Sequence, residues 1–213
     1  PYTVPKYTIN GEEVSAEVFR WAVGYLIYTD GSCLYSSNLL VAGAGCAAIQ
    51  ITPEGLRTIR FTIPPGIPQT AVVSEHVAVV KVAEKLPTGA KAHIVCDCQA
   101  VVNWAQKSSN ARVAHHNKMG GYWAEIGDKI EVATKVKAHL SKDQSAAAGQ
   151  AHLHKGNEIV DLLAKEAAPR YHQGDIDGYI KQMENSAKII GKIAMRLGAL
   201  IEGVGIALIP RHP

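Results

Sequence analysis

The chain contains little that would hold together a small extracellular module. Four cysteines in 213 residues are too few for a disulfide framework in a chain of this length, so we expect reduced and mostly buried thiols. The N-terminus, residues 1–6, lacks the apolar core of a secretory signal. The sequence therefore predicts an intracellular protein.

An uninterrupted apolar run long enough to cross a membrane is also missing. The most apolar stretch, residues 189–209, is broken by Lys192, Arg196 and Glu202. Charged side chains at the centre of a bilayer are costly, so a spanning helix is disfavoured. We therefore expect no membrane partner.

Aromatic residues make up only 6% of the chain, but the apolar content of 47% and the charged content of 19% are ordinary for a globular protein. A length of 213 residues allows one substantial core plus an appendage. The net charge of +3 is mildly basic and compatible with a polyanionic partner. Because the first residue is not Met, we expect a segment of a longer polypeptide.

Hydrophobic periodicity divides the chain into a lead-in at 1–22, a domain at 23–168 and an extension at 169–213. Within the domain, strand-like stretches cover residues 23–28, 43–51, 56–63, 92–97 and 130–138. Helical spacing covers residues 70–86, the surroundings of Val101 and Trp123, and residues 157–168. This order predicts an α/β fold with a mixed five-stranded sheet, in which three antiparallel strands are followed by parallel additions.

The extension differs in character from the domain. After Pro169, apolar residues recur every three or four positions from Ile180 to Ile201, whereas lysines and Arg196 occupy other faces. This spacing predicts a C-terminal amphipathic helix. We expect it to dock on this domain or on another domain of a parent polyprotein.

Four acidic residues stand at positions where they can converge. Asp30 and Asp97 each end an apolar run, Glu75 opens a helical pattern, and Asp161 lies one helical turn beyond residues 156–158. Carboxylates gathered from strand ends and facing helices repel one another unless cations neutralise them. The pattern therefore predicts a site for a divalent metal.

The residues around these acids resemble the type 1 ribonuclease H family. The resemblance covers roughly residues 22–168 and is closest to the retroelement branch. It rests on four motifs in order: Thr29-Asp30-Gly31-Ser32, Ser74-Glu75, Asp97-Cys98-Gln99 and Gly156-Asn157-Glu158-Ile159-Val160-Asp161. It implies a ribonuclease-H-like fold, and hydrolysis of the RNA strand of an RNA/DNA hybrid with two Mg²⁺ ions, Mn²⁺ being an alternative.

The resemblance also assigns roles to the acidic residues. Asp30 would bridge both ions, Asp161 would help hold the ion that activates water, and Glu75 and Asp97 would hold the ion at the leaving group. The family carries a mobile histidine that assists product release or proton transfer, a task suited to an imidazole. His139 matches it, and His154, in the longer loop that follows, is the alternative.

Substrate contacts are implied in the same way. The backbone around Gly31, Ser32 and Cys33 and the side chain of Gln99 match positions that the family uses near the 2′-hydroxyls. Thr70 matches a contact to a DNA phosphate. Because hybrids are recognised by shape and 2′-hydroxyls rather than by base sequence, we expect an RNA/DNA hybrid as the partner.

Three functions remain open. The first is an active ribonuclease H embedded in or released from a retroelement polyprotein. The second is a catalytically weak module that binds or packs, which the retention of all four acids disfavours. The third is a related two-metal DNA nuclease of the resolvase or integrase kind, since one fold supports several chemistries.

Overall fold

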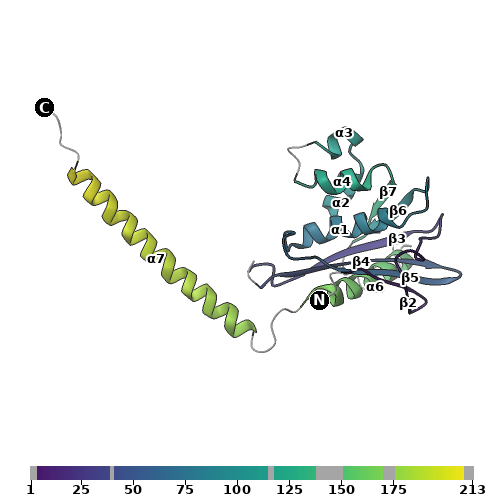
Figure 1. Ribbon diagram of the computed structural model, residues 1–213, viewed down its shortest axis with the longest axis horizontal. Helices are drawn as coiled ribbons and strands as arrows, with labels where there is room; N and C mark the ends of the chain where they lie inside the picture. The colour runs from purple at the N-terminus through teal and green to yellow at the C-terminus, as the bar shows by residue number, and fades with distance from the viewer. Residues whose placement is uncertain (1–3, 39–40, 115–117, 138–150, 170–175, 209–213) are drawn as a thin grey trace. The chain divides into compact units, whose positions relative to one another are not determined.

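The computed structural model describes residues 4–38, 41–114, 118–137, 151–169 and 176–208. The chain forms two compact units, Pro1–Tyr171 and His172–Pro213. The first unit consists of one sheet with helices on both faces: α1 to α4 lie on one side of it and α6 lies on the other (Figure 1). The second unit contains a single long helix, α7, within the described residues.

The sheet has seven strands in the order β2-β1-β5-β4-β3-β6-β7. β3, β4 and β5 form an antiparallel meander, whereas β6 and β7 run parallel to β3. The expected mixed sheet is therefore confirmed, with two strands more than expected. The bounds are Lys6–Ile9 for β1, Glu12–Val14 for β2, Ile27–Leu34 for β3, Gly43–Thr52 for β4, Gly55–Thr62 for β5, Ala92–Cys96 for β6 and Ile130–Lys135 for β7.

The two additional strands come from the segment expected as a lead-in. β1 pairs with β5, and β2 folds back on β1 across Asn10 and Gly11, whose φ angles are 54° and 85°. Asn and Gly tolerate this left-handed conformation, which a tight hairpin requires. Phe19 and Trp21, which follow the hairpin, are fully buried. This segment thus belongs to the sheet and to its core.

The helices follow the expected hydrophobic periods, with shifts at their ends. Thr70 caps the N-terminus of α1, where its Oγ1 accepts a hydrogen bond from the Val73 N–H at 3.2 Å. The expected strand 23–28 begins later and continues through Asp30, and α6 begins six residues before position 157. The short α3 was not expected. The bounds are Ala71–Glu84 for α1, Gln99–Ala105 for α2, Ser109–Arg112 for α3, Gly120–Ile126 for α4, Ala151–Ala167 for α6 and Ile176–Leu208 for α7.

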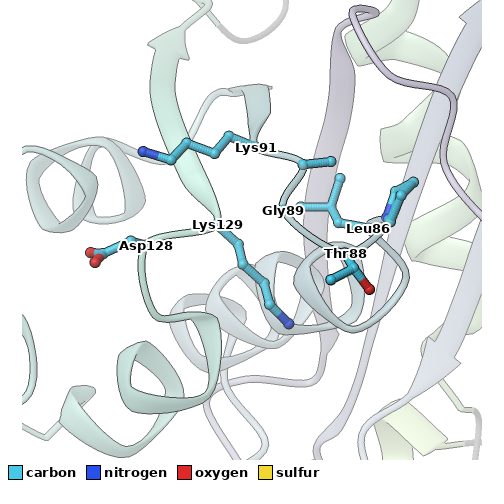
Figure 2. Close-up of a pocket in the computed structure, with 8 residues that line it drawn as sticks. Leu86, Thr88, Gly89, Lys91, Asp128 and Lys129 are labelled. Atoms are coloured by element: carbon cyan, nitrogen blue, oxygen red, sulfur yellow. The ribbon is translucent and has the colours of Figure 1, made fainter.

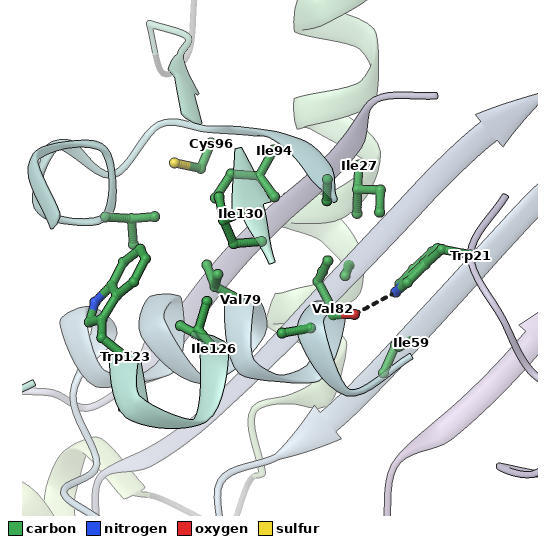
Figure 3. Packing of buried hydrophobic residues seen from close by; sticks show 14 of the residues in the cluster. Trp21, Ile27, Ile59, Val79, Val82, Ile94, Cys96, Trp123, Ile126 and Ile130 are labelled. Carbon is green, nitrogen blue, oxygen red and sulfur yellow. Dashed lines mark hydrogen bonds between the residues drawn. The ribbon is translucent and has the colours of Figure 1, made fainter. Parts of the chain in front are cut away.

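The sheet is covered by apolar clusters on both faces. On the face of α1, Ile27 and Ile94 pack against Val79, and the Trp21 indole N–H donates to the Val82 carbonyl at 3.2 Å (Figure 3). The opposite face packs against α6 through a cluster that contains Tyr28, Val95, Val160 and Ala164. Adjacent residues of β3 therefore face different helices, as the alternation of a strand requires.

Glycines set how closely α6 approaches the sheet. A Cβ at Gly45 would lie 2.3 Å from the Ala167 backbone, and one at Gly156 would lie 2.4 Å from the Tyr28 ring. Neither distance is tolerated by a packed interior. The small residues on both surfaces thus fix the position of the helix that carries Asp161.

No helix in the part of the chain that the structure describes is long and apolar enough to span a membrane. This holds for α7 as well, although its 33 residues make it the longest of the described helices.

Candidate active site

Asp30 and Asp97 come from two neighbouring parallel strands, β3 and β6. β3 and β6 are parallel, with Ile27 opposite Ile94 and Tyr28 opposite Val95. Each acid lies two residues beyond the last position at which β3 pairs with β6: Asp30 follows Tyr28 within β3, and Asp97 directly follows the end of β6 at Cys96. Asp30 shares the strand face of Tyr28 and is only 5% exposed. Its carboxylate is thus held inside the domain by a continuous strand.

Glu75 reaches the same place from α1. The backbone of α1 touches β3 at Gly31, where a Cβ would lie 2.3 Å from the Glu75 nitrogen and 2.5 Å from Ser74 Oγ. The backbone N–H of Gly31 lies near enough to the carboxylates of Asp30 and Glu75 to lower the pKa of both. Gly31 therefore allows the helix to approach, and its N–H partly offsets the electrostatic cost of both acids.

The three acids form one cluster. Carboxylate oxygens of Asp30, Glu75 and Asp97 all lie within 4.8 Å of one another. Glu75 is 6% exposed, and its Oε2 is buried with no hydrogen-bond partner among the described residues. A buried acceptor without a donor is costly, so this oxygen is oriented for a ligand that supplies positive charge.

Electrostatics of the cluster favour neutralisation. Burial, followed by the negative charges of Asp97 and Asp161, raises the pKa of Asp30 from 3.8 to about 7. Burial and the charges of Asp30 and Asp97 raise the pKa of Glu75 well above 4.5. The Gly31 N–H opposes both shifts and Lys165 opposes that of Asp30, but they do not outweigh burial and repulsion. The site therefore favours protons or cations.

Asp161 lies close enough to act on Asp30 but is not one of the three clustered acids. Its charge contributes to the raised pKa of Asp30. Its Oδ2 accepts a hydrogen bond from Lys165 Nζ at 2.7 Å, one turn further along α6. Lys165 was not predicted from the sequence, although its i,i+4 spacing from Asp161 is the spacing of a helical ion pair.

Most of the residues expected to contact substrate are close in sequence to the clustered acids: residues 31–33 follow Asp30, and Gln99 follows Asp97 by two positions. Ser32 pairs with Gly45 across β3 and β4. The Cys33 thiol donates to the Gln69 carbonyl at 3.3 Å, and burial raises its pKa. Gln99, the first residue of α2, donates through Nε2 to Asn103 Oδ1 at 2.7 Å.

Of the two candidate histidines, the structure describes only His154. His139 lies outside the described residues. His154 is buried on α6, and its Nε2 has no hydrogen-bond partner in the described part of the chain. It precedes Asp161 by two helical turns, about 10 Å along the helix axis.

A pocket lies apart from the acidic cluster. A pocket of about 420 Å³ is lined by residues 86–91 together with Asp128 and Lys129 (Figure 2). It lies where α1 ends and where β6 and β7 begin, whereas Asp97 follows the other end of β6. The pocket therefore does not belong to the acidic site.

The donor set fits a hard divalent cation. Carboxylate oxygens are the ligands that Mg²⁺ and similar ions prefer, and no residue that the structure describes donates to the buried Glu75 Oε2. Asp30, Glu75 and Asp97 each offer one oxygen within the 4.8 Å limit. The residues present are thus compatible with a divalent metal site.

The fold and the cluster define an α/β protein with an acidic site at the centre of a mixed sheet. The family model for RNase H matches residues 23–169, and the chain belongs to the RNase H family. The resemblance stated from the motifs is therefore confirmed, and membership of this family supports a hydrolase that acts on nucleic acid. A comparison with curated proteins found no match.

The fold of this chain is similar to that of a solved structure. The crystal structure of the prototype foamy virus protease-reverse transcriptase is 23% identical with a TM-score of 0.50, over 75% of this chain and 23% of that one. The chain thus spans about a quarter of that protein. The solution structure of the PFV RNase H domain is 22% identical with a TM-score of 0.48, over 68% of this chain and 93% of that one. RNase H1 from Halobacterium salinarum is 16% identical with a TM-score of 0.41, over 67% of this chain and 96% of that one.

Proposed function

We propose that this protein is an endoribonuclease that hydrolyses the RNA strand of RNA/DNA hybrids. The observation that carries the proposal is the cluster of Asp30, Glu75 and Asp97, whose oxygens lie within 4.8 Å of one another in a chain of the RNase H family. A phosphodiester is already anionic, so a site built only of carboxylates would repel it. The proposal therefore includes two Mg²⁺ ions, with Mn²⁺ as the alternative.

The acidic residues would hold these ions, with Asp30 between them, Asp161 on one side, and Glu75 and Asp97 on the other. When bound, the cations supply an activated water and stabilise the leaving 3′ oxygen. The N–H of Gly31 favours the charged forms of Asp30 and Glu75, which are the forms that would hold a cation. Lys165 restrains Asp161 at 2.7 Å, which limits the rearrangement needed when the substrate arrives.

The substrate would lie across β3 and the starts of α1 and α2. The backbone of Gly31, Ser32 and Cys33 and the amide of Gln99 are proposed to contact the 2′-hydroxyls of the RNA strand, the feature that separates RNA from DNA. Thr70 caps α1, a 14-residue helix, and we place a DNA phosphate there because helix N-termini attract anions.

A substrate panel tests the proposal. Labelled RNA/DNA hybrid, duplex RNA and duplex DNA are incubated with the purified chain, with Mg²⁺ and with a chelator. We expect cleavage of the RNA strand of the hybrid only, and none with the chelator. Cleavage of duplex DNA would instead indicate the resolvase-like alternative. Hybrid binding without cleavage would indicate a packing or binding module.

The retroelement context is part of the proposal. It rests on the Gly-Asn-Glu-x-x-Asp motif at 156–161, which is similar to that of the retroelement branch. The extension at 169–213 is proposed as a helical appendage outside the nuclease domain. Detection of the endogenous product only as a free-standing chain, never as part of a larger precursor, would contradict the polyprotein origin.

We propose His139 rather than His154 as the histidine that assists turnover. His154 is buried on α6, where an imidazole is poorly placed to exchange protons with water. His139→Ala is expected to slow steady-state cleavage about 100-fold, the lower end of the range for a lost proton-transfer group, without preventing it. His154→Ala serves as the control and is expected to cleave at the wild-type rate. A slow His154→Ala beside an unchanged His139→Ala would reverse the assignment.

A further inference from the structure

The spacing of apolar residues in α7 follows a heptad. They are separated alternately by three and four positions at Ile180, Met183, Ala187, Ile190, Ala194 and Leu197. The same spacing continues in the sequence through Ile201, Val204 and Leu208, all within the bounds of α7. A repeat of 3.5 residues sustained over four heptads is typical of a coiled coil.

The apolar side of the helix is exposed where its side chains are described. Ile190 is 66% exposed and Leu197 is 53% exposed. Ile193 and Leu200, also exposed, directly precede the stripe positions Ala194 and Ile201 and so widen this face. An apolar face of this extent in a water-soluble helix is typical of a surface that another chain covers.

Two glycines in α7 are not explained by contacts within the chain. A Cβ at Gly191 or Gly198 would meet nothing within 4 Å among the described residues. Glycine weakens a helix interior relative to Ala. Both directly follow a stripe residue, Ile190 and Leu197, and Ala187 and Ala194 lie in the stripe itself. Small residues of this kind allow the backbone of a second helix to approach closely.

The charge distribution of α7 is compatible with a partner identical to itself. The four basic residues of the described helix lie away from the apolar stripe, on its outer side: Lys181, Lys188, Lys192 and Arg196. The positions that flank the stripe from 184 to 200 carry one charge, that of Glu184. Because like charges at flanking positions would repel between two copies, their near absence permits pairing of the helix with itself.

We propose that α7 forms a coiled coil with α7 of a second copy of this chain. A helix of 33 residues is about 50 Å long and about 10 Å wide, so two copies bury on the order of 1,000 Å² along their facing stripes. This area reaches the lower end of specific interfaces. The pairing brings two catalytic domains into one molecule and is independent of whether they cleave RNA.

Sedimentation equilibrium of the full chain tests this proposal. The wild-type chain of 22.8 kDa is expected at twice that mass. The double variant Ile190→Glu, Leu197→Glu places charges in the stripe and is expected to weaken association at least about 100-fold, because burying unpaired charges is costly. The control variant Asn185→Glu, Ala199→Glu adds the same charge on the outer side and is expected to remain dimeric.

A wild-type chain that stays monomeric at all concentrations, or a stripe variant that still dimerises, would overturn the proposal. Flotation with vesicles of phosphatidylserine and phosphatidylcholine tests whether a lipid surface, rather than a second helix, covers the apolar face of this basic amphipathic helix. A monomer that floats with these vesicles would assign the face to a lipid surface and would also overturn it. Circular dichroism of both variants shows whether each chain remains folded.

Discussion

Replacing Asp97 by Asn is expected to lower the rate of RNA cleavage in a hybrid by at least about 1,000-fold, equivalent to about 4 kcal/mol of transition-state stabilisation. The substitution removes one of the three charges that lie within 4.8 Å of one another while it keeps the shape of the side chain. Single-turnover cleavage with excess enzyme measures the loss. It separates the chemical step from substrate binding and product release.

The matched control for this experiment is Asp128→Asn. Asp128 has an exposed side chain and lines the pocket near the starts of β6 and β7, so it changes the net charge by the same amount away from the acidic site. We expect its rate to stay within about twofold of wild type, since exposed ion pairs contribute little. Full activity of Asp97→Asn would show that Asp97 does not hold a metal.

Replacing Asp30 by Asn is expected to stabilise the metal-free protein at pH 8 by about 2 kcal/mol. Asp30 has a pKa of 3.8 in the unfolded chain and about 7 in the fold, so the folded state binds its proton more tightly. The resulting stability is fully present below pH 3.8 and is lost as the pH rises through about 7. The full shift corresponds to about 4 kcal/mol, and partial relaxation of the charged cluster reduces this. An amide cannot ionise and avoids the loss.

Urea unfolding in a chelator between pH 4 and pH 8 measures this effect. Wild type is expected to lose stability over that range, whereas Asp30→Asn loses less. Added Mg²⁺ should restore wild-type stability by mass action and should leave the variant nearly unchanged. Equal stabilities of the two proteins at pH 8 without metal would show that the buried charge of Asp30 is not a strain on the fold.

Most of the sheet could be predicted because its strands are long and bounded by turn residues. The stretches expected at 43–51 and 56–63 correspond to β4 and β5 within one residue at each end. β1 and β2 were missed because they are only four and three residues long. The dipeptide Asn10-Gly11 between them is a strong hairpin signal and would have identified the pair.

The site was harder to derive from sequence than the fold. Motif order brought Asp30, Glu75 and Asp97 forward as candidates, and the structure places them together. The short distances among them depend on strand register and on the contact of α1 with Gly31. Neither can be predicted from a single sequence. Lys165 was overlooked because a lysine in the last turn of a helix usually signals only a favourable helix dipole.

The parallel pairing of β3 with β6 has a consequence for how this protein tolerates change. One residue inserted between Ile94 and Asp97 would leave every acidic motif intact in the sequence. Since side chains alternate along a strand, that insertion would turn Asp97 toward the opposite side of the sheet. We therefore expect insertions and deletions to be tolerated in the loops of this domain but not in the last residues of β6 before Asp97. These few residues set both the pairing of the strand and the direction of the Asp97 side chain.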